Sequence, residues 1–94
     1  MTTTARATVQ HEDERTRITR WDFEPGQSTG RHVHEYDYVV VPVTDGHTDV
    51  ITPDGTVTRN ELRSGRSYAR SAGSEHEVVN AGTAPLAFVE VERK

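Results

Sequence analysis

The sequence predicts a single all-β domain with little or no helix, on three observations. Twelve of the 94 residues are valine, and β-branched side chains favour strands. Gly, Pro, Asn and Asp interrupt the chain at short intervals, as they do in domains built of many short strands. No stretch keeps the helical period of apolar residues. We therefore expect seven or eight strands arranged as a sandwich or barrel.

The amino-terminal half predicts the first strands. Residues 1–12 are small and polar and show no period, so we expect a flexible arm there and the folded domain over residues 13–94. The first strand is expected within "RTRITRWDF", because Thr, Ile, Trp and Phe suit a pleated surface. "EPGQSTG" then predicts a turn, and "RHVH" an extended segment after it.

The rest of the chain supplies the remaining strands. "DYVVVPVTDG" predicts the longest of them, and Pro42 within it lacks an amide donor, so we expect this strand at a sheet edge or with a bulge. "PDG" at residues 53–55 predicts a hairpin. Three further strands follow, separated by turns at Gly73 and at "AGTAP".

The composition narrows the classes of partner. A net charge of −4 and a pI near 5.7 give no electrostatic reason to expect nucleic acid or an anionic membrane. Without cysteine, any metal site would have to use His, carboxylate or water ligands. The sequence shows no apolar run of bilayer length and no secretory leader, so we expect a cytoplasmic protein. Leu, Ile, Val and Phe make up only about a fifth of the residues, and this thin core predicts a homodimer.

Three histidines form the candidate site. His32 and His34 are two residues apart, so on an extended segment both rings point to one face. His76 is predicted in a later strand, on the same face as Val78 and Asn80. Neutral imidazole is a good ligand for Fe, Ni and Zn, and three protein ligands leave a metal position open for water or substrate.

Two motifs around these histidines resemble those of the cupin family. "GQSTGRHVH" is similar to the first cupin motif at Gly26, His32 and His34, and the strand after it ends at Gly46 much as that motif does. "GRSYARSAGSEHEVVN" is similar to the second. Its matching residues are Gly65, Gly73, His76 and Asn80, and it departs from the family only at Ser71, where proline is usual. More narrowly, "HEYDYVVVPVTDG" resembles small single-domain cupins found near β-alanine degradation genes.

The resemblance implies a conical jelly-roll β-barrel that holds one divalent transition metal, Fe, Ni, Mn or Zn, through His32, His34 and His76. It fails where the family usually has a glutamate ligand, three or four residues after the second histidine, because Tyr38 and Val39 stand there. Either Tyr38 faces inward and takes the place of the glutamate, or Asp37 faces inward as a fourth ligand. Both faces of this strand are apolar, so periodicity leaves the two alternatives open, and motif register favours Tyr38.

Candidate catalytic residues are Tyr36, Asp37 and Tyr38, the tyrosines and the acid beside the histidines. Arg31 and Arg70 flank the histidine-bearing segments, where a guanidinium would pair with a carboxylate substrate. The resemblance implies a metal-dependent oxygenase, isomerase or lyase acting on a small carboxylate or carbonyl compound. The alternative is a non-catalytic cupin that binds a small molecule as a sensor or as an accessory to a pathway enzyme. The residues alone do not decide whether the protein is an enzyme.

Overall fold

The computed structural model describes residues 3–94, and this range contains nine strands and no helix. In chain order the strands are β1 (Arg6–Glu12), β2 (Thr16–Phe23), β3 (His32–Val33), β4 (Asp37–Pro42), β5 (Gly46–Ile51), β6 (Val57–Leu62), β7 (Tyr68–Arg70), β8 (Glu75–Asn80) and β9 (Leu86–Arg93). The predicted all-β fold is confirmed. Across the described part of the chain, no helix exists that could cross a membrane.

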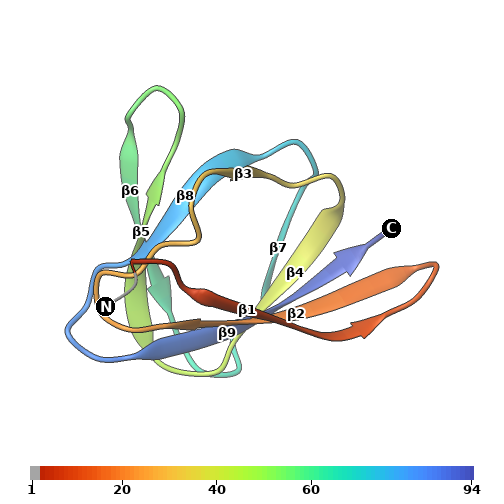
Figure 1. Cartoon of the computed structure of the whole chain (residues 1–94), viewed down its shortest axis with the longest axis horizontal. Coiled ribbons are helices and arrows are strands. Elements are labelled where there is room, and N and C mark those ends of the chain that lie inside the picture. The colour runs from red at the N-terminus through yellow and green to blue at the C-terminus, as the bar shows by residue number, and fades with distance from the viewer. Residues whose placement is uncertain (1–2) are drawn as a thin grey trace.

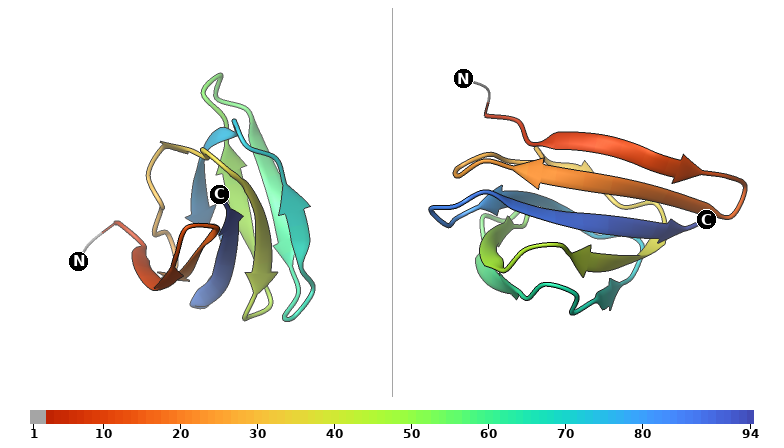
Figure 2. Two further views of the ribbon diagram at one scale, coloured as in Figure 1. Left: turned by 90° about the vertical axis from the view of Figure 1, so that its right-hand side faces the viewer. Right: turned by 90° about the horizontal axis from the view of Figure 1, so that it is seen from below.

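The strands form two antiparallel sheets that curve around a common interior (Figure 1). One sheet has the order β1-β2-β9-β4-β7, and the other has the order β3-β8-β5-β6. Figure 2 shows β1, β2, β9 and β4 side by side, with β1 at the outer edge. The carboxyl-terminal strand β9 therefore lies in the middle of its sheet, between β2 and β4, where its inward side chains reach the centre of the barrel.

The hydrophobic core follows from alternation along the strands. In β9 the inward positions begin with Leu86 and Phe88, and the ring of Phe88 lies 5.4 Å from that of Phe23, centroid to centroid. Leu62 and Val78 from the facing sheet pack into the same cluster. Since every second side chain of a strand points to the same face, these strands bury one face and expose the other.

The arm expected over residues 1–12 is different in the structure. From Arg6 onward the chain forms β1, which pairs antiparallel with β2 along its length. All seven residues of β1 are exposed, so this strand is held in place by its backbone pairing. Because it has no buried face, its sequence shows no alternation of apolar and polar residues. Residues 1–2 of the predicted arm lie outside the described residues.

The strand containing Pro42 shows neither the edge position nor the bulge expected of it, because β4 lies between β9 and β7 and its register with β9 runs without a shift to Pro42. The pairing with β7 covers only Tyr38–Val40, and Pro42 is the last residue of β4. Proline is tolerated at this position because the β4–β7 pairing has ended at Val40, so no hydrogen bond to β7 requires an amide at Pro42.

Candidate metal centre

Two short strands of the smaller sheet bring the three histidines together. His32 in β3 and His76 in β8 are direct antiparallel partners. His34 lies just beyond β3, where its amide donates to the carbonyl of Ser74 and its carbonyl accepts from the amide of Gly73. Gly73 turns with a φ of 94°, a conformation that favours glycine. The backbone therefore carries the histidines to one place although 42 residues separate the last two in sequence.

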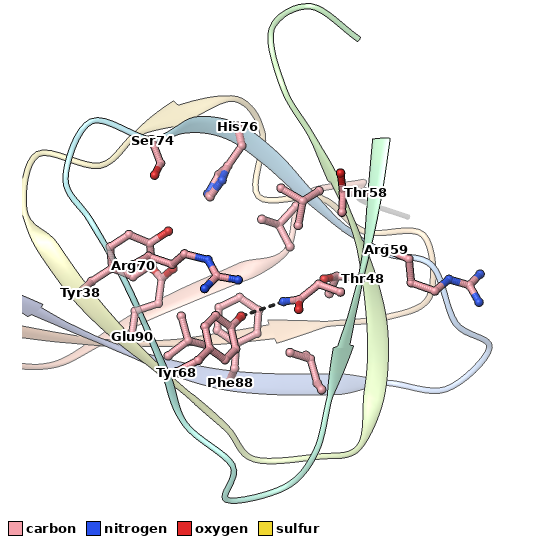
Figure 3. A pocket seen from close by; sticks show the side chains of 15 residues that line it. Tyr38, Thr48, Thr58, Arg59, Tyr68, Arg70, Ser74, His76, Phe88 and Glu90 are labelled. Atoms are coloured by element: carbon pink, nitrogen blue, oxygen red, sulfur yellow. Dashed lines mark hydrogen bonds between the residues drawn. The ribbon is translucent and has the colours of Figure 1, made fainter. Parts of the chain in front are cut away.

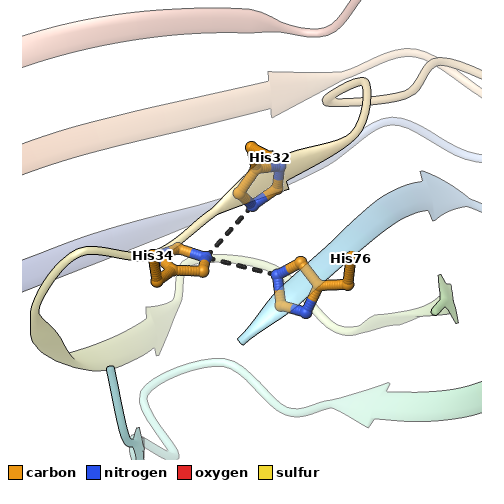
Figure 4. Close-up of side chains that lie close together, drawn as sticks. All are labelled: His32, His34 and His76. Carbon is orange, nitrogen blue, oxygen red and sulfur yellow. Dashed lines mark hydrogen bonds between the residues drawn. The ribbon is translucent and has the colours of Figure 1, made fainter. Parts of the chain in front are cut away.

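The ring nitrogens of the triad point at one another (Figure 4). The Nε2 atom of His34 lies 3.0 Å from Nε2 of His32 and 3.2 Å from Nε2 of His76. Nitrogens bound to one ion at about 2.0–2.1 Å lie roughly 3.0–3.4 Å apart. The donor type and spacing in His32, His34 and His76 thus fit a single divalent transition metal.

The surroundings keep the imidazoles in the form that binds a metal. The Nδ1 atom of His32 lies 3.0 Å from the carbonyl oxygen of Gly30. A hydrogen bond to this oxygen places the ring proton on Nδ1 and leaves the lone pair of Nε2 free to bind a metal. Burial, followed by the charges of neighbouring histidines, lowers the pKa of His34 from 6.5 to about 4. Burial first and His32 second lower the pKa of His76 to about 4 as well. At neutral pH both rings are therefore neutral.

Tyr38 faces inward, as motif register favoured. Its side chain is buried, and its ring stacks on His34 with centroids 3.9 Å apart and planes 16° from parallel. Burial raises the pKa of this phenol to about 12, so it stays protonated. A phenol stacked flat on the imidazole supports the orientation of His34.

The structure does not bring Asp37 to the histidines, so the alternative of Asp37 as a fourth ligand is wrong. The side chain is exposed, because β4 alternates and Tyr38 takes the inward face. The Oδ1 atom of Asp37 accepts a hydrogen bond from the amide of Ala72 at 2.8 Å, and Oδ2 lies 3.8 Å from Arg93. Asp37 anchors the turn after β7 instead.

Tyr36 is half-buried and lies outside both cavities that adjoin the triad. Of the three candidate catalytic residues, only Tyr38 contacts a histidine of the site. Of the two arginines, Arg70 lines a cavity beside the site, and Arg31 is exposed.

One carboxylate that the sequence analysis missed does lie at the triad. Glu90 of β9 is 8% exposed, and its Oε2 atom lies 3.9 Å from Nε2 of His34. Its Oε1 atom accepts a hydrogen bond of 3.0 Å from the indole nitrogen of Trp21. Burial raises the pKa of this carboxyl to about 7. The signal in the sequence was a pair of acids at alternate positions of "AFVEVERK", on the same face as Phe88.

A cavity of about 200 Å³ opens beside the triad inside the barrel (Figure 3). Its polar lining includes His76, Glu90, Tyr68, Asn60 and Arg70. The guanidinium of Arg70 lies over the Tyr68 ring, 4.5 Å from its centroid, and the amide of Asn60 donates to the Tyr68 hydroxyl at 2.9 Å. The apolar part of the lining consists of Val40, Val50, Leu62, Val78 and Phe88. A second cavity, on the other side of the triad, is lined by His32, His34 and, again, Glu90.

Comparison with known proteins is consistent with this geometry. A family model described as a cupin domain matches residues 19–92. The chain is 47% identical, over 93% of its length and 90% of the relative's, to the β-alanine degradation protein BauB of Pseudomonas aeruginosa. A crystal structure of a cupin domain from Bordetella pertussis is 45% identical, with a TM-score of 0.92 over 97% of this chain and 94% of that one. A double-stranded β-helix protein from Klebsiella pneumoniae is 25% identical, with a TM-score of 0.78 over 96% and 76%.

Proposed function

The chain belongs to the cupin family, and from that premise we propose that it is a metal-binding cupin whose His32, His34 and His76 hold one divalent transition metal. The observation that carries the proposal is the convergence of three Nε2 atoms, with spacings of 3.0 and 3.2 Å around His34. Iron, nickel, manganese and zinc are the candidate metals. All of them accept imidazole nitrogen together with oxygen donors.

The ligand we propose is a small carboxylate or carbonyl compound bound in the cavity beside the triad. A volume of about 200 Å³ suits a small molecule, and Arg70 at the cavity wall can pair with a carboxylate. The name of the relative BauB connects that protein with the degradation of β-alanine, a small carboxylic acid. Arg70 would bind and orient the acid group, while Tyr68 and Asn60 offer hydrogen bonds to the rest of the ligand.

The first class of activity is that of a metal-dependent oxygenase, isomerase or lyase. When bound, the metal supplies a Lewis acid or an oxygen-activating centre. The protein itself contributes neutral donors, an arginine for the acid group, and apolar walls of Val40, Leu62 and Phe88 that exclude water from the inner part of the cavity.

The second class is a non-catalytic cupin that binds a small molecule as a sensor or as an accessory to a pathway enzyme. The observation that favours it is the apolar part of the cavity lining, formed by Val40, Leu62 and Phe88 among others, which suits binding of a small molecule. A metal-loaded protein that binds small acids saturably without converting them would support this class.

We also propose a cytoplasmic homodimer, with no nucleic acid or membrane as a partner. Support for the dimer is the outer edge of the larger sheet, where every residue of β1 is exposed. Val9 on this strand is 56% exposed and Val33 of β3 is 57% exposed. Both line the second cavity, the one that His32, His34 and Glu90 also line. An unpaired edge strand with exposed apolar residues is a surface on which a second copy can dock. The acidic net charge of −4 supports the absence of nucleic acid.

The first experiment is elemental analysis of protein purified without an affinity tag. We expect about one equivalent of transition metal in the wild type and none in His76→Ala, because the variant lacks one of three ligands. His11→Ala is the matched control, since His11 is exposed and bonds only Asp13 through its ring. A wild type that stays free of metal after reconstitution with each candidate ion, or a His76→Ala variant that keeps its metal, would refute the proposal.

A further inference from the structure

The short segment that carries His32 and His34 has a second face, which points away from the triad. The two histidine rings meet inside the barrel, with their Nε2 atoms 3.0 Å apart. Arg31, Val33 and Glu35 alternate with the histidines and are all exposed, and Val33 is 57% exposed. Because side chains alternate along an extended backbone, the segment directs its histidines inward and these three residues outward. We call the outward residues Arg31, Val33 and Glu35 the docking face.

The charges of the docking face are arranged symmetrically about its apolar centre. Arg31 lies two residues before Val33, and Glu35 lies two residues after it. A second copy turned by 180° about an axis at Val33 would place each Arg31 beside the Glu35 of the other copy, with the two valines in contact between them. In a twofold interface of this kind, the same patch of both copies forms the contact. The docking face is therefore complementary to itself in both charge and shape of pattern.

Both charges of the docking face are available for such a contact. Within residues 3–94, Arg31 and Glu35 form no ion pair or hydrogen bond through their side chains. Other exposed acids nearby have cations of their own, since Asp37 lies 3.8 Å from Arg93 and Glu12 lies 2.6 Å from Lys94. The pairing of Arg31 with Glu35 across two copies would thus break no ion pair within either copy.

The docking face lies at an open sheet edge. β3 is the outermost strand of the smaller sheet and pairs with β8 alone. The opposite edge of this sheet is β6, whose middle carries the exposed charges of Arg59 and Glu61. Charged side chains in the middle of an edge strand protect it against association. At β3 the middle of the docking face is Val33, so this edge lacks the protection that β6 has.

β1 extends the surface available to a second copy. Val9 of β1 is 56% exposed and lines the same cavity as Val33, so the two valines lie on either side of one opening of the barrel. All seven residues of β1 are exposed. A stable dimer buries roughly 800 Å² on each partner, which is more than the docking face can supply alone. β1 is the neighbouring surface that can supply the remainder.

We infer that two copies of the chain associate through the docking face, with the twofold axis at Val33 and β1 at the side of the contact. This inference rests on the proposed function, which includes the homodimer, and it names the surface that forms it. The consequence concerns the triad, because the same segment carries two of its histidines. Only two residues of this segment pair with β8. The second copy would therefore hold the segment from outside while His32 and His34 face the metal.

The test is sedimentation equilibrium of the metal-free protein, which measures the dissociation constant of the dimer. Arg31→Glu and Glu35→Arg each place like charges at both symmetry-related contacts, so each should raise this constant on the order of 10-fold or more. The two changes combined restore opposite charges with the positions exchanged. We expect the double variant to return to within about threefold of the wild type, because charge complementarity is regained.

Val33→Lys tests the centre of the contact, because it brings two ammonium groups together at the axis, and should also raise the dissociation constant on the order of 10-fold or more. Val57→Lys is the matched control, since Val57 is 55% exposed on the opposite edge strand, and its dimer should match that of the wild type. Circular dichroism verifies that each variant is folded.

Three results would overturn the inference: a monomeric wild type, a double variant that is no tighter than the single variants, or a Val57→Lys variant that dissociates as readily as Val33→Lys. The first would also remove the proposed homodimer, and the other two would leave it in place on a different surface. None of them bears on the metal centre, because the measurement uses metal-free protein and the metal content of the same preparation is determined separately.

Discussion

The two halves of the inward face of β9 differ sharply although one strand carries both. Leu86 and Phe88 lie in the hydrophobic core, whereas Glu90 and Glu92 are acids that are almost equally buried. The backbone geometry is the same in both halves. The apolar half lowers the free energy of the folded state by removing side chains from water, and the acidic half places charge next to the histidines.

The two acids in turn differ in what surrounds them. Glu92 has a guanidinium and Glu90 has an indole N–H, and the pKa of Glu90 is raised to about 7 chiefly by burial. We therefore expect the charge of Glu92 to contribute to stability and the charge of Glu90 to reduce it.

The largest effect is expected in the apolar half. Phe88→Ala removes a buried ring that packs on Phe23 and lines the cavity, and should lower the free energy of unfolding by about 3–5 kcal/mol. Chemical denaturation of the metal-free protein measures this loss. If the variant is destabilised by less than about 1 kcal/mol, Phe88 is not part of the core that we describe.

A smaller effect is expected on acidification of the metal-free protein. His34 and His76 have pKa values near 4 in the folded chain and near 6.5 when exposed. Between these two pH values the unfolded state binds more protons than the folded state, so the free energy of unfolding falls as the pH falls. The raised pKa of Glu90 acts in the opposite direction, because the folded state takes up its proton first. We expect a net loss of about 1–2 kcal/mol between pH 7 and pH 5, measured by denaturation at each pH.

The histidine contribution is isolated by His76→Asn, which does not titrate in this range. Its stability should depend less on pH between 6.5 and 4 than that of the wild type. An equal or steeper dependence in the variant would show that His76 is not the source of the loss.

The smallest effect is the change in stability when Glu90 or Glu92 is replaced by glutamine, and we expect the two changes to have opposite signs. Glu90→Gln should raise the stability of the metal-free protein at pH 8 by about 1 kcal/mol, because it removes a buried charge, and the gain should vanish below pH 4.5, where the carboxyl is protonated in both states. Glu92→Gln should lower stability by about 1 kcal/mol, since Arg17 loses its charged partner. Thermal and chemical denaturation at both pH values decide. Equal signs for the two variants would remove the distinction between Glu90 and Glu92.

Much of the site was predictable because its signals are local. A two-residue spacing places His32 and His34 on one face of any extended segment, and the glycine-punctuated motifs placed His76 with them. The choice between Asp37 and Tyr38 was not local, because both faces of β4 are apolar and only the packing of Tyr38 on His34 shows which one is inward. The edge strand β1 was missed because a strand exposed along its whole length carries no hydrophobic period.

By itself the sequence determined that this protein is an all-β chain with His32 and His34 on one face, since residue preference and alternation act over a few positions. That His76 joins them was implied only by the resemblance to the cupin motifs. Only the tertiary structure decided that Glu90 stands beside His34 and that Asp37 does not. The contact between Glu90 and His34 joins residues 56 positions apart, one on β9 of the larger sheet and one just beyond β3 of the smaller sheet. Such a contact depends on how the two sheets close around the interior, which no short stretch of sequence encodes.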